Sequence, residues 1–192
     1  SPIPNPQSPI PNPHFIFLFL SNYLYNYKNI NLKLNMENNK NIYKFLFKNE
    51  EKRTEIIKDM EVKLNEIIQG IESTWKLTGQ IEKTPQKYNE YSQNVMKELQ
   101  KLNDELKKYS EMNSDSYKKD VKFLLNLEGE NYKTTLTIFI NKLNCFDMIK
   151  NDEDEYKLIK KEKEISVLKE TLADIREQIN DFITNLKYKY LN

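Results

Sequence analysis

Apolar residues recur at helical spacing along much of the chain, most regularly near its C-terminus. In "ISVLKETLADIREQINDFITNL", the apolar positions are separated by alternating steps of three and four. They are Ile165, Leu168, Leu172, Ile175, Ile179, Phe182 and Leu186. This spacing places them on one stripe of an α-helix. The preceding "NDEDEYKLIKKEKE" has acidic residues before lysines, an order that suits a helix N-terminus. We therefore predict a long C-terminal coiled-coil helix within residues 151–192.

Two earlier segments predict a helical hairpin over residues 36–112. The first stripe comprises Ile57, Met60, Leu64, Ile67, Ile71 and Trp75. We predict that this helix begins after an N-cap at Asn49 and ends near Gly79 and Pro85. The second stripe comprises Tyr88, Tyr91, Val95, Leu99, Leu102, Leu106 and Tyr109. Because the connection between the two is short, the second helix is expected to fold back antiparallel to the first.

Residues 113–150 have a mixed pattern and are interpreted as a linker with short helices. Val121 to Leu127 predicts one short helix that ends at Gly129. The stretch "TTLTIFI" that follows is rich in β-branched residues and resembles a strand. Four apolar residues, the first two within this stretch and the others after it, are nevertheless spaced as in a helix. They are Leu136, Phe139, Leu143 and Phe146. We therefore favour a helix here.

The first 35 residues differ from the rest in composition. "SPIPNP" occurs twice, and six of the seven prolines lie in this segment. The apolar run "FIFLFL" that follows is far shorter than the about 20 residues that span a bilayer. We expect residues 1–35 to be a disordered extension. It is interpreted either as translated sequence upstream of Met36, outside the native protein, or as a targeting segment, and the first interpretation is favoured.

Composition argues against several classes of function. Lys and Arg number 30 against 29 Asp and Glu, and only Arg53 and Arg176 are arginines. Near-zero net charge and scarce arginine argue against a nucleic-acid-binding protein. The chain has one cysteine, Cys145, and one histidine, His14, which leaves no catalytic set of residues. We predict no enzymatic activity, no cofactor and no metal. Trp75 and the tyrosines are interpreted as core residues rather than as a stacking platform for bases.

The C-terminal stripe is therefore the candidate functional site. The first two helices can cover each other, but a helix as long as the last would leave part of its stripe in water. Burial stabilises by about 25 cal/mol per Å², so exposure of seven such residues would be costly. We predict that a partner chain covers them. The predicted partner-binding residues are Ile165, Leu168, Leu172, Ile175, Ile179, Phe182 and Leu186.

The order of elements resembles a known family. "LNEIIQGIESTWKL" (residues 64–77), "NVMKELQKLNDELKKY" (residues 94–109) and "LKETLADIREQINDFITNL" (residues 168–186) are similar to three helices of small helical head subunits of the Mediator complex. The similarity is greatest to subunit 30. Mediator is the co-activator of RNA polymerase II. The resemblance implies a nuclear, non-enzymatic structural subunit that regulates transcription. It would link activators to the polymerase indirectly, through coiled-coil packing with other subunits and without direct contact with nucleic acid or membrane.

Two other functions fit the same pattern. One is a coiled-coil subunit of a cytoplasmic tethering or adaptor complex, in which "FIFLFL" would touch a membrane. The other is a helical chaperone cofactor that binds client chains through its exposed stripes. All three functions share one fold class: an all-α extended bundle with a helical hairpin and a long C-terminal helix.

Overall fold

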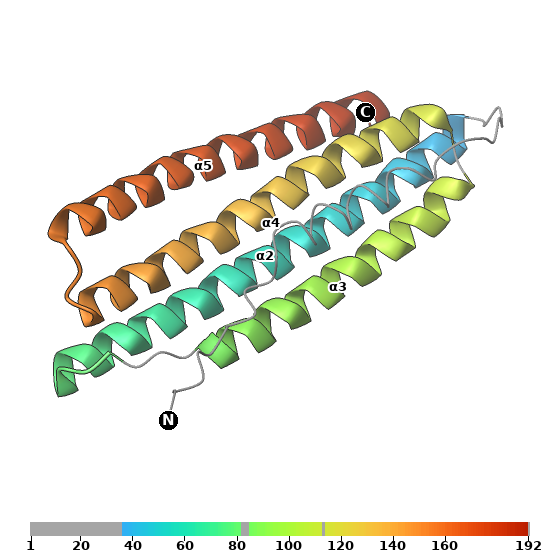
Figure 1. Cartoon of the computed structure of the whole chain (residues 1–192). Coiled ribbons are helices and arrows are strands. Elements are labelled where there is room, and N and C mark those ends of the chain that lie inside the picture. Colours follow the sequence, from blue (N-terminus) through green and yellow to red (C-terminus); the bar gives the residue numbers. More distant parts are fainter. Residues whose placement is uncertain (1–35, 82–84, 113, 192) are drawn as a thin grey trace.

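The computed structural model of the chain describes residues 36–81, 85–112 and 114–191, and these residues form an all-α bundle. The helices are α2 (Met36–Thr78), α3 (Pro85–Glu111), α4 (Asp115–Lys150) and α5 (Glu155–Leu191). They run up, down, up and down, so each is antiparallel to the next (Figure 1). The predicted all-α class and the antiparallel hairpin are confirmed. The predictions for residues 1–35, including His14, lie outside the described residues.

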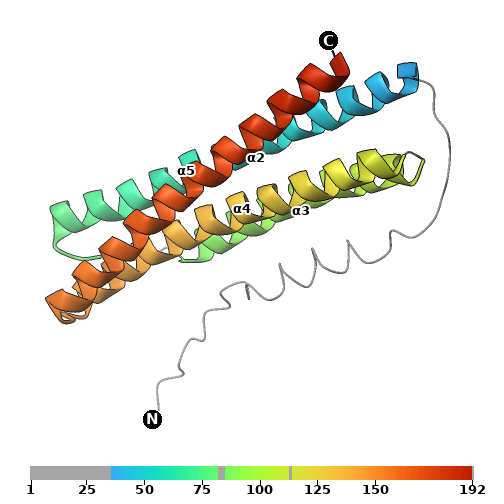
Figure 2. The ribbon, with the colours of Figure 1, turned by 90° about the horizontal axis from the view of Figure 1, so that it is seen from above.

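Two of the four helices lie at the centre of the bundle. Helix α2 contacts α3, α4 and α5, and α4 likewise contacts the other three, whereas the described parts of α3 and α5 make no contact with each other. The order across Figure 1 is accordingly α5, α4, α2, α3. Figure 2 shows α5 crossing over α2, with which it is in contact. Because α2 and α4 have neighbours on several sides, both must carry apolar residues around much of their circumference.

Helix α4 corrects the interpretation of residues 113–150 as a linker with short helices. The segment is one helix of 36 residues, and Gly129 lies inside it rather than at its end. A glycine inside a helix costs about 1 kcal/mol relative to alanine, which flanking buried side chains outweigh. The β-branched stretch is also helical: Thr135 is fully buried, and its Oγ1 donates to the carbonyl of Asn131 (2.8 Å). Tertiary contacts, not local preference, decide the conformation here.

Helix α2 corrects the predicted position of the first helix start. It begins at Met36, so Asn49 lies inside the helix and is not its N-cap. Asn49 is 3% exposed, and its Nδ2 donates to the carbonyl of Leu102 in α3 (3.2 Å). Its Oδ1 accepts a hydrogen bond from Nε of Arg53 (2.8 Å). The side chain therefore joins two helices, which is a use of asparagine that the local sequence does not reveal.

Several helix ends lie at residues whose side chain or backbone conformation is typical of a helix cap. Gly79, at φ +66°, ends α2, and its N–H donates to the carbonyl of Trp75 (2.8 Å). Ser114 caps α4 by accepting from the N–H of Tyr117. Before α5, Oδ1 of Asp154 accepts from the N–H of Tyr156 (3.0 Å). The predicted end of α2 at Gly79 and the acidic start of the C-terminal helix are both confirmed.

Candidate interaction surfaces and a polar cleft

The C-terminal stripe lies inside the bundle. Five of its seven residues are at most 8% exposed: Ile165, Leu172, Ile175, Ile179 and Leu186. Leu168 and Phe182 are half-buried. These residues pack within clusters that include side chains of α4 and α2. The expectation that the chain by itself leaves part of this stripe in water is therefore wrong.

The reason for this correction lies in the length of α4. Helix α4 has 36 residues and lies beside the 37 residues of α5, so it buries most of the stripe for which a partner chain is predicted. Binding of a partner by the seven stripe residues stays a prediction. It would require α5 to separate from α4.

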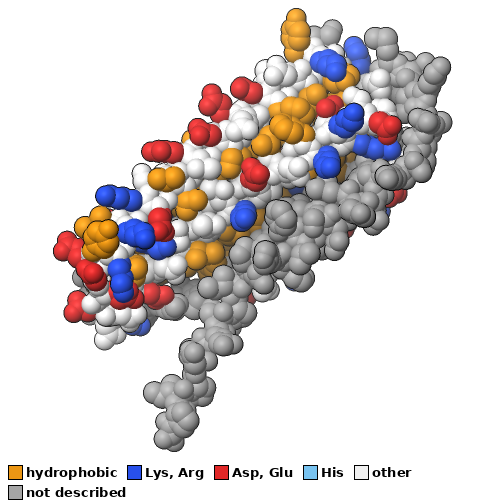
Figure 3. Space-filling view, turned by 45° about the horizontal axis from the view of Figure 1, so that its top comes forward, with side chains coloured by type: hydrophobic (Ala, Val, Ile, Leu, Met, Phe, Trp, Pro, Cys, Tyr) orange, Lys and Arg blue, Asp and Glu red, His pale blue; other side chains and the backbone are white. Residues whose placement is uncertain are grey.

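A smaller apolar surface remains outside, at the seam between α4 and α5. Phe123 of α4 is 47% exposed, and its ring lies 4.7 Å from that of Phe182, centroid to centroid. The exposed lysines Lys119 and Lys122 lie on α4 beside Phe123, and Lys189 lies two turns beyond Phe182 on α5. We call these five residues the seam patch. Figure 3 shows hydrophobic side chains flanked by basic ones toward the end of the bundle where α5 ends.

Acidic side chains form a line of their own on α5 that ends at Asp181, next to Phe182 in the sequence. Glu170, Asp174, Glu177 and Asp181 are exposed, and their spacing places them on one line along the helix. On α4, the carboxylate of Asp120 accepts a hydrogen bond from the hydroxyl of Tyr43 (2.5 Å). That bond directs this charge toward α2. The seam patch therefore presents aromatic rings next to lysines.

Aromatic packing stabilises the end of the bundle that carries this patch. The ring of Tyr190, near the end of α5, stacks on that of Tyr43 with centroids 3.6 Å apart. Tyr117 contacts Tyr43 edge-on at 5.8 Å, and Phe45 stacks on Tyr109 at 4.2 Å. All four helices contribute to these contacts. They hold the last turn of α5 in place and so fix the position of the seam patch.

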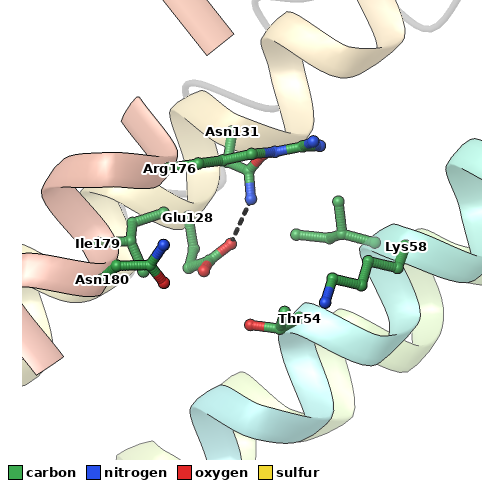
Figure 4. A pocket seen from close by; sticks show the side chains of 8 residues that line it. Thr54, Lys58, Glu128, Asn131, Arg176, Ile179 and Asn180 are labelled. Carbon is green, nitrogen blue, oxygen red and sulfur yellow. Dashed lines mark hydrogen bonds between the residues drawn. The ribbon is translucent and has the colours of Figure 1, made fainter. Parts of the chain in front are cut away.

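A polar cleft of about 140 Å³ opens between α2, α4 and α5. Its lining residues are Thr54, Ile57, Lys58, Glu128, Asn131, Arg176, Ile179 and Asn180 (Figure 4). Nδ2 of Asn131 donates to Glu128 (3.0 Å), and Oδ1 of Asn131 accepts from Nε of Arg176 (3.1 Å). Arg176 also forms an ion pair with Glu61 of α2 (3.0 Å). One arginine thus links α5 to both central helices.

Behind this cleft, two glutamates meet in the interior of the bundle. Glu50 of α2 is 5% exposed and Glu128 of α4 is 4% exposed. The two side chains are hydrogen-bonded to each other, and Oε1 of Glu50 has no hydrogen-bond partner. Burial, followed by the nearby Glu128, raises the pKa of Glu50 well above its usual value, while Arg53 acts weakly in the opposite direction. No sequence pattern indicates this pair, because its two members are 78 positions apart.

Trp75 is a further correction. It was interpreted as a core residue, but it is 36% exposed at the end of α2. With Ile81 and Ile149 it lines a pocket of about 320 Å³ at the opposite end of the bundle from the seam patch. The same interpretation of the tyrosines holds for Tyr88, which is buried, and in part for Tyr91, which is half-buried. It is wrong for Tyr156 and Tyr188, which are 72% and 76% exposed.

Cys145 is the candidate nucleophile that lies within the described residues. Cys145 packs beside Ile138 and Ile165, and burial raises the pKa of its thiol, which favours the unreactive protonated form. Within residues 36–81, 85–112 and 114–191, no three His, Cys, Asp or Glu side chains are grouped so as to hold a metal ion. In the same part of the chain, no helix is long and apolar enough to cross a membrane.

Comparison of the chain with protein-family models, with curated proteins and with solved structures gave no match.

Proposed function

We propose that this protein is a non-enzymatic structural subunit of a larger assembly, which it joins through helix packing at the seam patch. The observation that carries the proposal is the exposure of Phe123, 47%, beside the ring of Phe182, on a bundle that buries most of its C-terminal stripe between its own helices. An aromatic ring in water beside a second ring is typical of an interface centre.

The charges around the patch suit one kind of occupant. On a protein of near-zero net charge, Lys119 precedes Phe123 by one helical turn and Lys122 is its neighbour in sequence. Lys189 lies two turns beyond Phe182, with its Nζ over the ring of Tyr190 (4.9 Å). A partner helix with apolar residues on one face and acidic residues beside them would bury Phe123 and pair with the lysines. We therefore assign the patch to an acidic amphipathic helix of a neighbouring subunit.

The proposed assembly is the Mediator complex, in the nucleus. The support for this step is the resemblance of residues 64–77, 94–109 and 168–186 to helices of its small head subunits, subunit 30 above all. In this proposal the protein contacts other Mediator subunits directly and RNA polymerase II only through them. The contact surface is the outside of α4 and α5, rather than the stripe that faces inward.

The test is affinity purification of the full chain with a C-terminal tag, followed by mass spectrometry. The wild-type chain is compared with Phe123→Glu and with Val62→Glu, a matched control at an exposed apolar position on α2 (54% exposed). We expect a stoichiometric set of Mediator subunits with wild type and Val62→Glu, and its loss with Phe123→Glu. Circular dichroism checks that both variants are folded.

The other outcomes contradict the proposal at different steps. A set of tethering or coat proteins would move the protein to a cytoplasmic adaptor complex. Weak, promiscuous capture of many chains would indicate a chaperone cofactor. Partners that withstand Phe123→Glu would show that the seam patch is not the interface, and recovery of the chain alone would refute the subunit role.

A further inference from the structure

The central contact between α2 and α4 contains two acidic residues where a bundle of this kind normally places apolar ones. Glu50 and Glu128 lie on different helices, are buried, and are hydrogen-bonded to each other. A hydrogen bond between two carboxyl groups needs one proton, because two carboxylates have only acceptors. The geometry of the pair is thus that of one neutral acid donating to one carboxylate.

Two basic side chains lie near Glu128, and one lies near Glu50. On the cleft side, Lys58 of α2 and Arg176 of α5 line the same cavity as Glu128 (Figure 4). Glu128 also accepts a hydrogen bond from Asn131. Glu128 therefore has a hydrogen-bond donor and basic side chains beside it. Glu50, whose Oε1 has no partner, is the member of the pair on which the proton is expected.

Glu50 has fewer hydrogen-bond donors and cations nearby that would stabilise a negative charge. Arg53, on the same helix, is the nearby cation, and it donates to Asn49 and to Asn103 of α3. The group that α3 contributes near Arg53 is therefore the neutral amide of Asn103. Oε1 of Glu50 has no hydrogen-bond partner, which is tolerable for a neutral acid and costly for a buried anion.

We propose that Glu50 and Glu128 form a proton-dependent latch between α2 and α4, closed while Glu50 is protonated and loosened when both groups are ionised. The latch is a property of the bundle itself and is independent of the proposed partner surface. The cleft gives water access to Glu128, so the proton can exchange with solvent while the bundle stays folded. Because α2 and α4 are the central helices, loosening of this contact would reach every other helix.

The direction of the pH dependence follows from the raised pKa of Glu50 in the folded chain. Between the ordinary pKa of a glutamate and the folded value, the folded protein holds one more proton than the unfolded protein. This stabilisation is complete below the ordinary pKa and is lost as the pH rises through the folded value. Within that window, the equilibrium constant for unfolding should rise by up to tenfold for each pH unit.

The experiment compares urea unfolding of the wild-type chain and Glu50→Gln from acidic to alkaline pH. Glutamine is a neutral isostere of protonated glutamate and can still donate to Glu128. We expect similar stability at acidic pH and a growing advantage of Glu50→Gln as the pH rises. Glu51→Gln, at an exposed position on the same helix, is the control and should follow the wild type at every pH. A constant difference between Glu50→Gln and wild type across the pH range would overturn the proposal.

A second measurement tests the proton and the opening directly. Infrared spectra of the wild type, recorded at increasing pH, should still contain the C=O stretch of a protonated carboxylic acid above the ordinary pKa of a glutamate, and Glu50→Gln should lack it there. Hydrogen exchange of amides around residue 50, compared between the two proteins at the same alkaline pH, should be faster in the wild type. Absence of the carboxylic-acid band would show that Glu50 is ionised, and equal exchange would show that ionisation does not loosen the contact.

Discussion

Arg176 of α5 and Glu61 of α2 form an ion pair, with Nη2 of the arginine 3.0 Å from Oε2 of the glutamate. The two residues are 115 positions apart in the chain, on helices that cross in the folded bundle. Arg176 also donates to Asn131 and Thr135 of α4. One side chain therefore joins the three helices that surround the polar cleft.

Replacement of Arg176 should destabilise the bundle through lost hydrogen bonds more than through the lost ion pair. We expect Arg176→Ala to lower the free energy of unfolding by about 1–3 kcal/mol, because Asn131 loses a charged donor. The ion pair with Glu61 is partly exposed, so its own contribution should be below about 1 kcal/mol. Urea unfolding of both single variants and of the double variant Arg176→Ala with Glu61→Ala separates the two effects. A coupling energy well above this limit would contradict the assignment.

Shortening a buried side chain of the C-terminal stripe should destabilise the fold itself, and not only weaken the binding of a partner. Ile179 is 5% exposed in the core, and Ile179→Ala should cost about 2–5 kcal/mol from lost burial and the cavity left behind. Val167→Ala, at a 60% exposed position on the same helix, should change stability by less than about 0.5 kcal/mol. Thermal unfolding followed by circular dichroism measures both. Equal stability of the two variants would mean that the stripe is not packed as described.

Gly70, inside α2, and Gly79, just after its end, should respond to alanine in opposite directions. Gly70 is exposed inside α2, and an added Cβ would meet nothing within 4 Å. Gly70→Ala should therefore stabilise the protein by about 0.5–1 kcal/mol. Gly79→Ala should destabilise it, since φ at this position is +66°, where L side chains are strained. Chemical unfolding midpoints of the two variants give the comparison, and the same sign for both would contradict it.

Removal of the Asn49 side chain should leave buried polar groups without partners. Asn49→Ala deletes the hydrogen bond to the Leu102 carbonyl and the acceptor for Arg53. We expect a loss of about 1–3 kcal/mol, the usual cost of unsatisfied buried groups. A role as N-cap, in contrast, would predict only local fraying of the helix start. Hydrogen exchange across α2 and α3 distinguishes the two: a loss of protection in both helices supports the interhelical role.

The sequence by itself determined the secondary structure of most of the chain. Steps of three and four in apolar positions made the helices predictable, and Gly79 marked the end of α2. Local chemistry was less informative for α4, where Gly129 and a β-branched stretch predicted interruption. That helix persists because α2, α3 and α5 surround it, and burial of its side chains outweighs weak local preferences of at most about 1 kcal/mol per residue.

Only the tertiary structure decided what the apolar stripes face and which polar groups meet. Periodicity shows that Ile175 and Ile179 lie on one side of a helix, but it does not say whether that side meets another chain or the same chain. The partner of Glu50 is likewise invisible in the sequence, because Glu128 reaches it only when α2 and α4 pack together. Contacts between residues distant in sequence arise from the packing of whole helices, and the candidate seam patch and the acidic pair both depend on such contacts.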